Sequence, residues 1–158
     1  MKIGVLADSH DHLDNLRAVM ARFKEAGVKT VIHAGDFVAP FTLPVLGEAG
    51  CPVIGVFGNN DGERVGLSRG FARLGELHER PHELVLNGRR LLVLHEPVAL
   101  PELASSFDLV IYGHTHRVDV GQNLLNPGEV CGWVTGKSTA ALVDLPEKGD
   151  PRIQILEL

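Results

Sequence analysis

The sequence predicts a mixed α/β protein in which two β-sheets pack together and helices flank them on the outside. Short apolar runs alternate with helix-like segments in the first half of the chain, and hairpins are more frequent in the second half. The length of 158 residues and the hydrophobic content of 44% are those of one ordinary globular domain. No linker, internal repeat or low-complexity segment interrupts the chain, so we expect residues 1–158 to form a single domain.

The first half has the pattern of buried strands separated by helices. Apolar residues between Leu13 and Phe23 recur at helical spacing, and Asp11 is a candidate N-cap for that helix. A short helix is expected at residues 41–48, and a weaker helical pattern covers residues 66–77. The expected strands are residues 2–7, 30–34 and 52–57.

The second half contains the clearest turn signal of the chain. Asn87 and Gly88 separate two strand-like segments, and Asn-Gly is the strongest short signal for a β-hairpin. We therefore expect residues 82–86 and 89–95 to pair, with a short helix near residues 101–105. The remaining expected strands are residues 108–112, 123–125, 138–145 and 152–158.

Composition excludes some classes of function. The formal net charge is −5 and no basic run is present, so a nucleic-acid polymer is not an expected partner. No segment has the length and apolar character of a membrane span, and the N-terminus does not resemble a signal peptide. We expect a cytoplasmic protein in which Cys51 and Cys131 are reduced thiols.

Eight histidines are many for a chain of this length, and several of them lie in polar clusters that follow apolar strands. Ligands of open α/β sheets gather at the carboxyl ends of strands, so these clusters are expected to converge in space. The glycines that precede Asp36, Asn59 and His114 permit close backbone approach. The five clusters are Asp8-Ser9-His10, Gly35-Asp36, Gly58-Asn59-Asn60-Asp61, His95 and Gly113-His114-Thr115-His116.

The clusters contain more candidate ligands than one metal ion needs. Asp8 and His10, like His114 and His116, are two residues apart, and such pairs point the same way in extended backbone. The full candidate set is Asp8, His10, Asp36, Asn59, His95, His114 and His116. A zinc ion usually takes four ligands, so this set suits two divalent metals with Asp36 as the bridge. Nitrogen and oxygen donors favour manganese, iron, zinc or nickel.

The charge of such a centre fits a phosphate ester. Two divalent cations and two aspartates leave a net charge of about two plus, which a phosphodiester monoanion and a hydroxide would together cancel.

The order of the clusters resembles the motifs of the calcineurin-like metallophosphoesterases: D-x-H, G-D, G-N, a later histidine and G-H-x-H. The resemblance runs from Asp8 to His116 and continues through Leu125-Asn126-Pro127-Gly128, which is familiar in the small single-domain members. It implies a two-sheet sandwich flanked by helices and hydrolysis of a phosphate ester by a hydroxide held at a dinuclear metal centre, with manganese the favoured metal. By resemblance, one metal is held by Asp8, His10, Asp36 and His116, and the other by Asp36, Asn59, His95 and His114.

Two positions depart from the family pattern. Many members carry a histidine after the metal-binding asparagine, whereas this chain has Asn60, which cannot act as a proton donor to the leaving group. Either the enzyme favours good leaving groups, or His12 or a metal-bound water replaces that acid. Glu96-Pro97 follows His95 where a glycine is common, which puts the local loop shape in doubt. Asp36, His114 and Asn60 are the candidate catalytic residues.

Other polar residues have plainer interpretations. His33 lies within an apolar strand and is expected to be a core histidine bonded to backbone, and His78 and His82 are expected to be solvated. Asp61 is as consistent with orienting a ligand as with an ordinary turn. Residues 132–138 imitate a phosphate-binding loop, but they have three residues between the glycines instead of four and precede a strand instead of a helix.

Three functions compete. A metal-dependent phosphodiesterase acting on a small phosphate ester is favoured, because the ligand set is complete and the small family members resemble that class. A non-catalytic metal-binding scaffold for partner proteins is the alternative, since some proteins of this fold bind partners. A nuclease would need a basic groove, which the acidic balance argues against. The resemblance is also compatible with a homo-oligomer.

Overall fold

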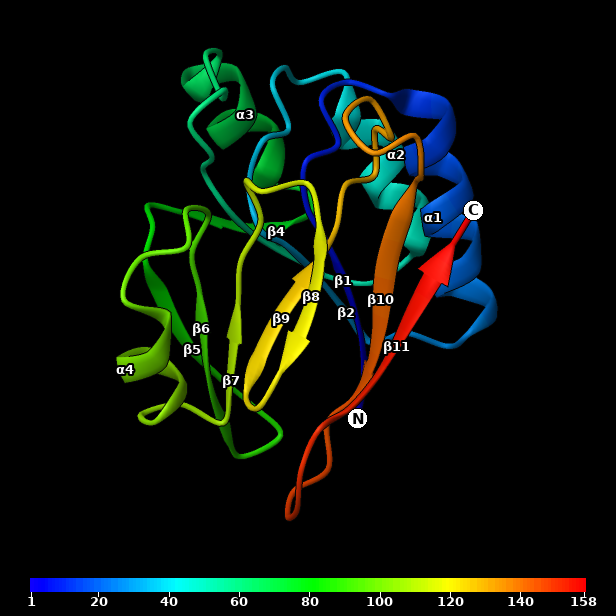
Figure 1. Ribbon diagram of the computed structural model, residues 1–158. Coiled ribbons are helices and arrows are strands. Elements are labelled where there is room, and N and C mark those ends of the chain that lie inside the picture. Colours follow the sequence, from blue (N-terminus) through cyan, green and yellow to red (C-terminus); the bar gives the residue numbers. More distant parts are fainter.

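The computed structural model describes residues 1–158 and contains two β-sheets that face each other, with helices on their outer sides (Figure 1). The first sheet has the strand order β11-β10-β1-β2-β3-β4, and the second has the order β5-β6-β7-β9-β8. The strands of the first sheet are β1 (Lys2–Leu6), β2 (Thr30–His33), β3 (Val53–Val56), β4 (Gly75–His78), β10 (Thr139–Asp144) and β11 (Arg152–Glu157). Those of the second are β5 (His82–Leu86), β6 (Arg89–Val93), β7 (Leu109–Ile111), β8 (Val118–Gly121) and β9 (Leu124–Pro127).

Parallel pairing aligns the strand ends that carry the polar clusters. β1 pairs with β2, and β2 with β3, in parallel register, so that Leu6 lies beside His33 and His33 beside Gly55. In the second sheet β6 and β7 are also parallel, with Val93 beside Ile111. The His95 ring, after β6, lies 2.8 Å from the Ala34 carbonyl, after β2, so the carboxyl ends of all five strands lie at the same end of the sandwich.

Three apolar layers hold the elements together. Side chains of β1, β2, β3 and β10 meet those of β6, β7 and β9 between the sheets. The outer face of the first sheet packs against α1 (Leu13–Glu25), α2 (Thr42–Leu46) and α3 (Arg64–Phe71), with the short 3₁₀ turn Gly47–Ala49 extending α2. The outer face of the second sheet packs against α4 (Leu100–Ala104). The expected sandwich of two sheets flanked by helices is confirmed.

The helix α1 follows its sequence pattern except at its cap. Leu16, Val19, Met20 and Phe23 form its buried face. The cap is His12 instead of the expected Asp11, because the His12 ring accepts the Asn15 backbone N–H. The Asp11 carboxylate instead accepts the Ala39 N–H and so ties two loops together.

One expected helix is shorter than its sequence pattern, and one strand was not expected. The helical pattern at residues 66–77 ends at Phe71, and the chain then forms the edge strand β4 beside β3. The unexpected strand is β8, which pairs antiparallel with β9. The Asn87-Gly88 hairpin is confirmed, and both residues have the positive φ that a tight turn of this kind needs.

None of the helices combines the length and apolar character that crossing a lipid bilayer would demand.

Candidate metal centre

The five polar clusters lie at the ends of β1, β2, β3, β6 and β7, and hydrogen bonds join their loops directly. The Asp8 N–H donates to the Gly35 carbonyl at 3.0 Å, and the His10 N–H donates to the Asp36 carbonyl at 3.1 Å. The Gly113 N–H donates to the His95 carbonyl at 3.1 Å. The convergence expected from strand order is therefore present.

Asp36 lies at the middle of the cluster and is almost fully buried. Its Oδ2 is 3.4 Å from His10 Nε2 on one side and 3.3 Å from His95 Nε2 on the other. Asn60 donates to both Asp36 oxygens, through its backbone N–H at 2.8 Å and its side-chain amide at 2.7 Å. The carboxylate thus touches both halves of the candidate ligand set, which is the position that a bridging ligand requires.

On one side of the centre, the side-chain oxygen of Asn59 lies close to the rings of His95 and His114. Asn59 Oδ1 is 2.9 Å from His95 Nε2 and 2.9 Å from His114 Nδ1. His95 Nδ1 lies 2.8 Å from the Ala34 carbonyl, which fixes the ring and directs Nε2 toward Asp36. His95 is buried, whereas Asn59 and His114 are exposed, so the centre opens to solvent on their side.

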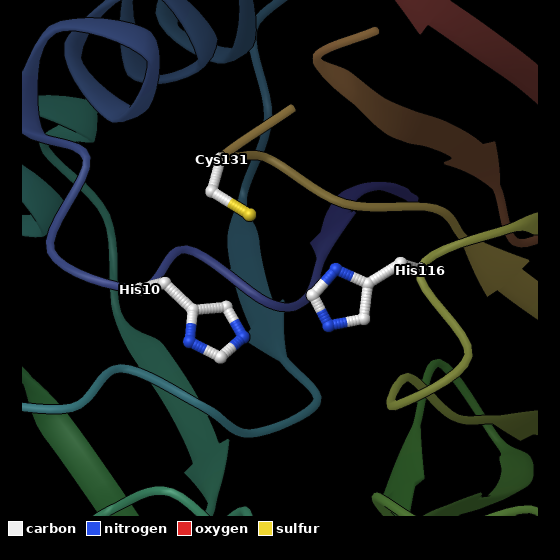
Figure 2. Close-up of side chains that lie close together, drawn as sticks. All are labelled: His10, His116 and Cys131. Carbon is white, nitrogen blue, oxygen red and sulfur yellow. The ribbon is translucent and has the colours of Figure 1, made fainter. Parts of the chain in front are cut away.

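The other side of the centre is formed by Asp8, His10 and His116. Asp8 Oδ1 is 3.7 Å from His116 Nε2 and 3.9 Å from His10 Nε2, and the Asp8 carboxylate accepts the His114 backbone N–H. The His10 and His116 rings stack with centroids 5.1 Å apart. Figure 2 shows the sulfur of Cys131 pointing toward the space between these two rings.

The local backbone differs from the extended geometry that the i and i+2 spacing suggested. Asp8, His10, His114 and His116 all have positive φ, between 41° and 67°, and Asp36 has φ 61°. Such conformations are uncommon for residues with a Cβ, and they gather where a surrounding structure holds them for function. The paired ligands converge, but through left-handed turns after the strands instead of through continued strand.

Two glycines allow the loops to approach as closely as they do. A Cβ on Gly58 would lie 2.0 Å from Asp36 Oδ1, and a Cβ on Gly35 would lie 2.7 Å from His95 Nδ1. Gly35 also has φ +94°, a conformation that favours glycine. The expected role of the glycines before Asp36 and Asn59 is confirmed.

The Asp61 carboxylate binds the backbone of the two loops that carry Asp36 and Asn59. It accepts backbone N–H groups of Asp36 at 3.2 Å, Val38 at 2.7 Å and Gly58 at 2.6 Å. The side chain is buried, and these bonds fix the loops that follow β2 and β3. Of the two interpretations left open by the sequence, the orienting role is the one that the contacts favour.

A second supporting carboxylate, Glu129, was not expected. It is buried and contacts His116 Nδ1 at 2.7 Å, accepts from Cys131 Sγ at 3.0 Å, and accepts from the backbone N–H groups of Val134 and Thr135. Burial would raise the pKa of Glu129, but the hydrogen bonds from His116, Cys131 and Thr135 lower it to about 2. The carboxylate therefore stays charged and holds the His116 ring in place. Its position directly after Asn126-Pro127-Gly128 was the only sequence signal.

Cys131 adds a sulfur atom to a site expected to contain only nitrogen and oxygen donors. Potential ligand atoms of His10, His116 and Cys131 all lie within 4.8 Å of one another. Burial and the neighbouring Glu129 raise the pKa of the thiol to about 12, so it is a neutral group unless a cation binds beside it. Cys51 is also a free thiol, as expected, and lies elsewhere.

The burial and hydrogen bonding of the aspartates and of His10 in the centre are those of a site that binds metal cations. Burial raises the pKa of Asp8 to about 7, and burial also lowers the pKa of His10. Burial would raise the pKa of Asp36 as well, but hydrogen bonds from His95 and Asn60 hold it below its ordinary value. His10 Nε2 is buried and has no hydrogen-bond partner. A buried imidazole nitrogen without a partner, beside carboxylate and amide oxygens, fits a divalent metal ion.

The environments of the other histidines agree only in part with the expectations from sequence. His33 is a buried core residue, but its partner is the Ser9 hydroxyl at 2.9 Å instead of the backbone. Burial lowers the pKa of His33 to about 3. His12 borders the exposed Trp133, whose ring centroid is 6.1 Å from that of His12 and 5.9 Å from that of His10. Residues 132–138 form a loop before β10, as the rejection of a phosphate-binding helix expected.

Comparison with known proteins places the chain in a family. The model of the calcineurin-like phosphoesterase superfamily domain matches residues 1–148. The chain belongs to this family.

A curated relative and a solved structure agree with that placement over nearly the whole chain. Phosphodiesterase MJ0936 of Methanocaldococcus jannaschii is 37% identical over 167 residues, covering 99% of this chain and 100% of the relative. The structure of an archaeal phosphodiesterase superposes with a TM-score of 0.87 and 34% identity, and the match covers 99% of this chain and 100% of that one.

A more distant likeness concerns the fold alone. A Vps29 variant from Entamoeba histolytica superposes with a TM-score of 0.71 at 17% identity, covering 100% of this chain and 99% of that chain.

Proposed function

We propose that the protein is a metal-dependent phosphodiesterase whose centre holds two divalent cations bridged by Asp36. The observation that carries this proposal is the position of the Asp36 carboxylate, within 3.4 Å of His10 on one side and of His95 on the other. One cation is assigned to Asp8, His10, Asp36 and His116, and the second to Asp36, Asn59, His95 and His114. Membership of the family and the 37% identical phosphodiesterase support the reaction type.

Manganese is the proposed activating metal, with zinc, iron or nickel as alternatives. The hard oxygen ligands Asp8, Asp36 and Asn59 suit manganese. Cys131 lies beside His10 and His116 and would favour zinc or iron at that position. When bound, two such cations activate a water molecule as the nucleophile and offset the negative charge of the reacting phosphate.

The protein residues around the centre orient and hold charge. Asn60 donates its side-chain amide to Asp36, so we assign it to positioning that carboxylate instead of protonating the leaving group. His114 is exposed and stands beside Asn59 at the open side, where an incoming ester would meet it. Without an acid at position 60, we expect good leaving groups to be favoured, unless His12 at the rim supplies the proton.

The substrate proposed is a small phosphate ester. The centre lies open at Asn59 and His114, and the exposed Trp133 offers a flat apolar surface next to His10. The net charge of −5 argues against a nucleic-acid polymer. A cytoplasmic location, a single domain and a homo-oligomeric state remain predictions, the first supported by two free cysteines.

The test uses protein stripped with a chelator and then supplied with manganese. Hydrolysis of bis-p-nitrophenyl phosphate is compared with that of p-nitrophenyl phosphate, in the wild type and in Asp36→Asn. We expect manganese to restore cleavage, with the diester preferred. Because loss of a supporting residue alone weakens metal sites ~10–100-fold, loss of the bridge is expected to cost at least ~100-fold in rate.

Asp14→Asn is the matched control, since the Asp14 side chain is 92% exposed and its charged partner, at 3.6 Å, is Arg17, which is not a proposed ligand. It should keep the wild-type rate. A folded wild-type protein without activity in any divalent metal would contradict the proposal and favour the scaffold alternative. Wild-type metal content and rate in Asp36→Asn would show that Asp36 does not bridge.

A further inference from the structure

A second group of metal-ligating side chains lies outside the centre described above, where the chain passes from one sheet to the other. Glu76 and His78 lie on β4, and His82 begins β5. His78 Nε2 is 2.9 Å from Glu76 Oε2, and the His78 and His82 rings stack with centroids 3.5 Å apart. Potential ligand atoms of all three residues lie within 4.8 Å of one another. The two histidines are half-buried instead of solvated, which corrects the expectation from sequence.

The backbone explains why these three side chains meet. Glu76 and His78 are two residues apart in a strand, so both point to the same face. β4 is an edge strand of the first sheet and β5 is an edge strand of the second, and the short connection between them brings His82 over His78. Glu76 is exposed, so solvent reaches the group.

We propose that Glu76, His78 and His82 form a third, peripheral site for a divalent transition metal, separate from the dinuclear centre. Two imidazoles and one carboxylate form a donor set that zinc uses, and they leave a fourth position open to water. Imidazole donors also suit copper and nickel. Ligand atoms around one tetrahedral zinc are about 3.3 Å apart, so donors that lie within 4.8 Å of one another need to approach by at most about 1.5 Å. One of the parallel rings turns on binding, because a ring nitrogen coordinates in the plane of its ring.

The segment between the two histidines connects this site to the dinuclear centre. Arg80 donates to the Phe57 carbonyl at 2.8 Å and to the Gly58 carbonyl at 3.2 Å. Its other nitrogens donate to the two Glu96 oxygens at 2.5 and 2.6 Å. Gly58 precedes Asn59, and Glu96 follows His95. A metal held by His78 and His82 would therefore brace the residue that ties together the loops carrying both of those proposed ligands.

The count of bound zinc tests the proposal without relying on activity. Chelator-stripped protein is titrated with zinc and analysed by native mass spectrometry. We expect three zinc ions in the wild type and two in the double variant His78→Gln/His82→Gln. Glu83→Gln is the control, because Glu83 is an exposed carboxylate on the same strand and lies outside the group. It should keep three. An equal zinc count in the wild type and in the double variant would overturn the proposal, because the third ion would then not depend on His78 and His82.

Two further variants distinguish loss of the peripheral site from misfolding and from loss of the dinuclear centre. Glu76→Gln changes an exposed side chain, so it should lower the affinity for the third zinc ion at least tenfold without affecting folding. Asp36→Asn should lose zinc from the dinuclear centre, whereas zinc should still protect His78 and His82 from diethylpyrocarbonate in that variant. Loss of this protection would contradict the peripheral site, and a full dinuclear count in Asp36→Asn would contradict the proposed function instead. The two proposals can therefore fail separately.

Discussion

Asp61→Asn should weaken both the fold and the metal centre, because the Asp61 carboxylate is surrounded by donors. One oxygen accepts the Asp36 and Gly58 N–H groups and the other accepts the Val38 N–H. In the amide, an NH₂ group replaces one of these oxygens and faces a backbone N–H. Hydrogen bonds to a charged group contribute ~1.5–3 kcal/mol each, so we expect a loss of about 3 kcal/mol in the free energy of unfolding.

Urea unfolding of the chelator-stripped protein, followed by circular dichroism, measures that loss. Metal affinity should fall ~10–100-fold as well, because a residue that orients metal-binding loops is removed. Asp14→Asn makes the same chemical change at a solvent-exposed site, where it removes only a surface ion pair with Arg17. It should leave metal affinity unchanged and stability within ~0.5 kcal/mol of the wild type. If Asp61→Asn unfolded within ~0.5 kcal/mol of the wild type and bound metal equally well, the assignment of Asp61 as the support of both loops would be refuted.

Three other changes probe separate parts of the centre. Glu129 has a pKa of about 2, below the ordinary 4.5, so its stabilising contribution is present above pH 4.5 and lost as the pH falls toward 2. The stability difference between wild type and Glu129→Gln should shrink over that range in urea titrations, and a constant difference would contradict this. Gly58→Ala places a Cβ 2.0 Å from Asp36 Oδ1 and should lower metal content and rate more than tenfold, whereas Gly62→Ala, with open space at its Cβ, should not. Asn60→His removes the side-chain amide bond to Asp36 but keeps the backbone N–H bond, so metal content should be unchanged at saturating manganese. The rate on esters with poor leaving groups should rise, by at most ~10²–10⁴-fold, and an unchanged ratio between poor and good leaving groups would count against this.

The sequence predicted the parts of the fold that local patterns encode. The buried strands β2 and β3 are short apolar runs, and the β5–β6 turn is marked by Asn87 and Gly88. β4 has no such mark, since Gly75–His78 is mostly exposed and becomes a strand only by pairing with β3. Pairing with β3 determines that this segment is a strand, and a pattern confined to neighbouring residues does not reveal it.

The candidate ligands were predicted because they share one position, the end of an apolar strand. Their supporting residues share no such position. Glu129 reaches His116 from beyond β9, and Arg80 reaches Glu96 across the two sheets. The Arg80–Glu96 pair also accounts for the Glu96-Pro97 departure, because the glutamate anchors the loop after His95 to its neighbour. Contacts of this kind depend on the assembled fold.

The left-handed backbone at the ligand positions was also beyond sequence reasoning. Strand periodicity suggested that Asp8 and His10 point the same way in extended chain, yet both have positive φ. Such conformations cost of order 1–3 kcal/mol each, and hydrogen bonds from neighbouring loops hold them. The paired side chains converge as expected, but through left-handed turns and not through the extended backbone that the spacing suggested.

If Asp36 bridges two cations held by the other six side chains, both cations should be visible by anomalous diffraction from crystals grown with manganese. Two manganese peaks ~3.5–4 Å apart are expected, with the Asp36 carboxylate between them. One peak alone, or two peaks with Asp36 outside the shared ligand position, would contradict the bridging role of Asp36.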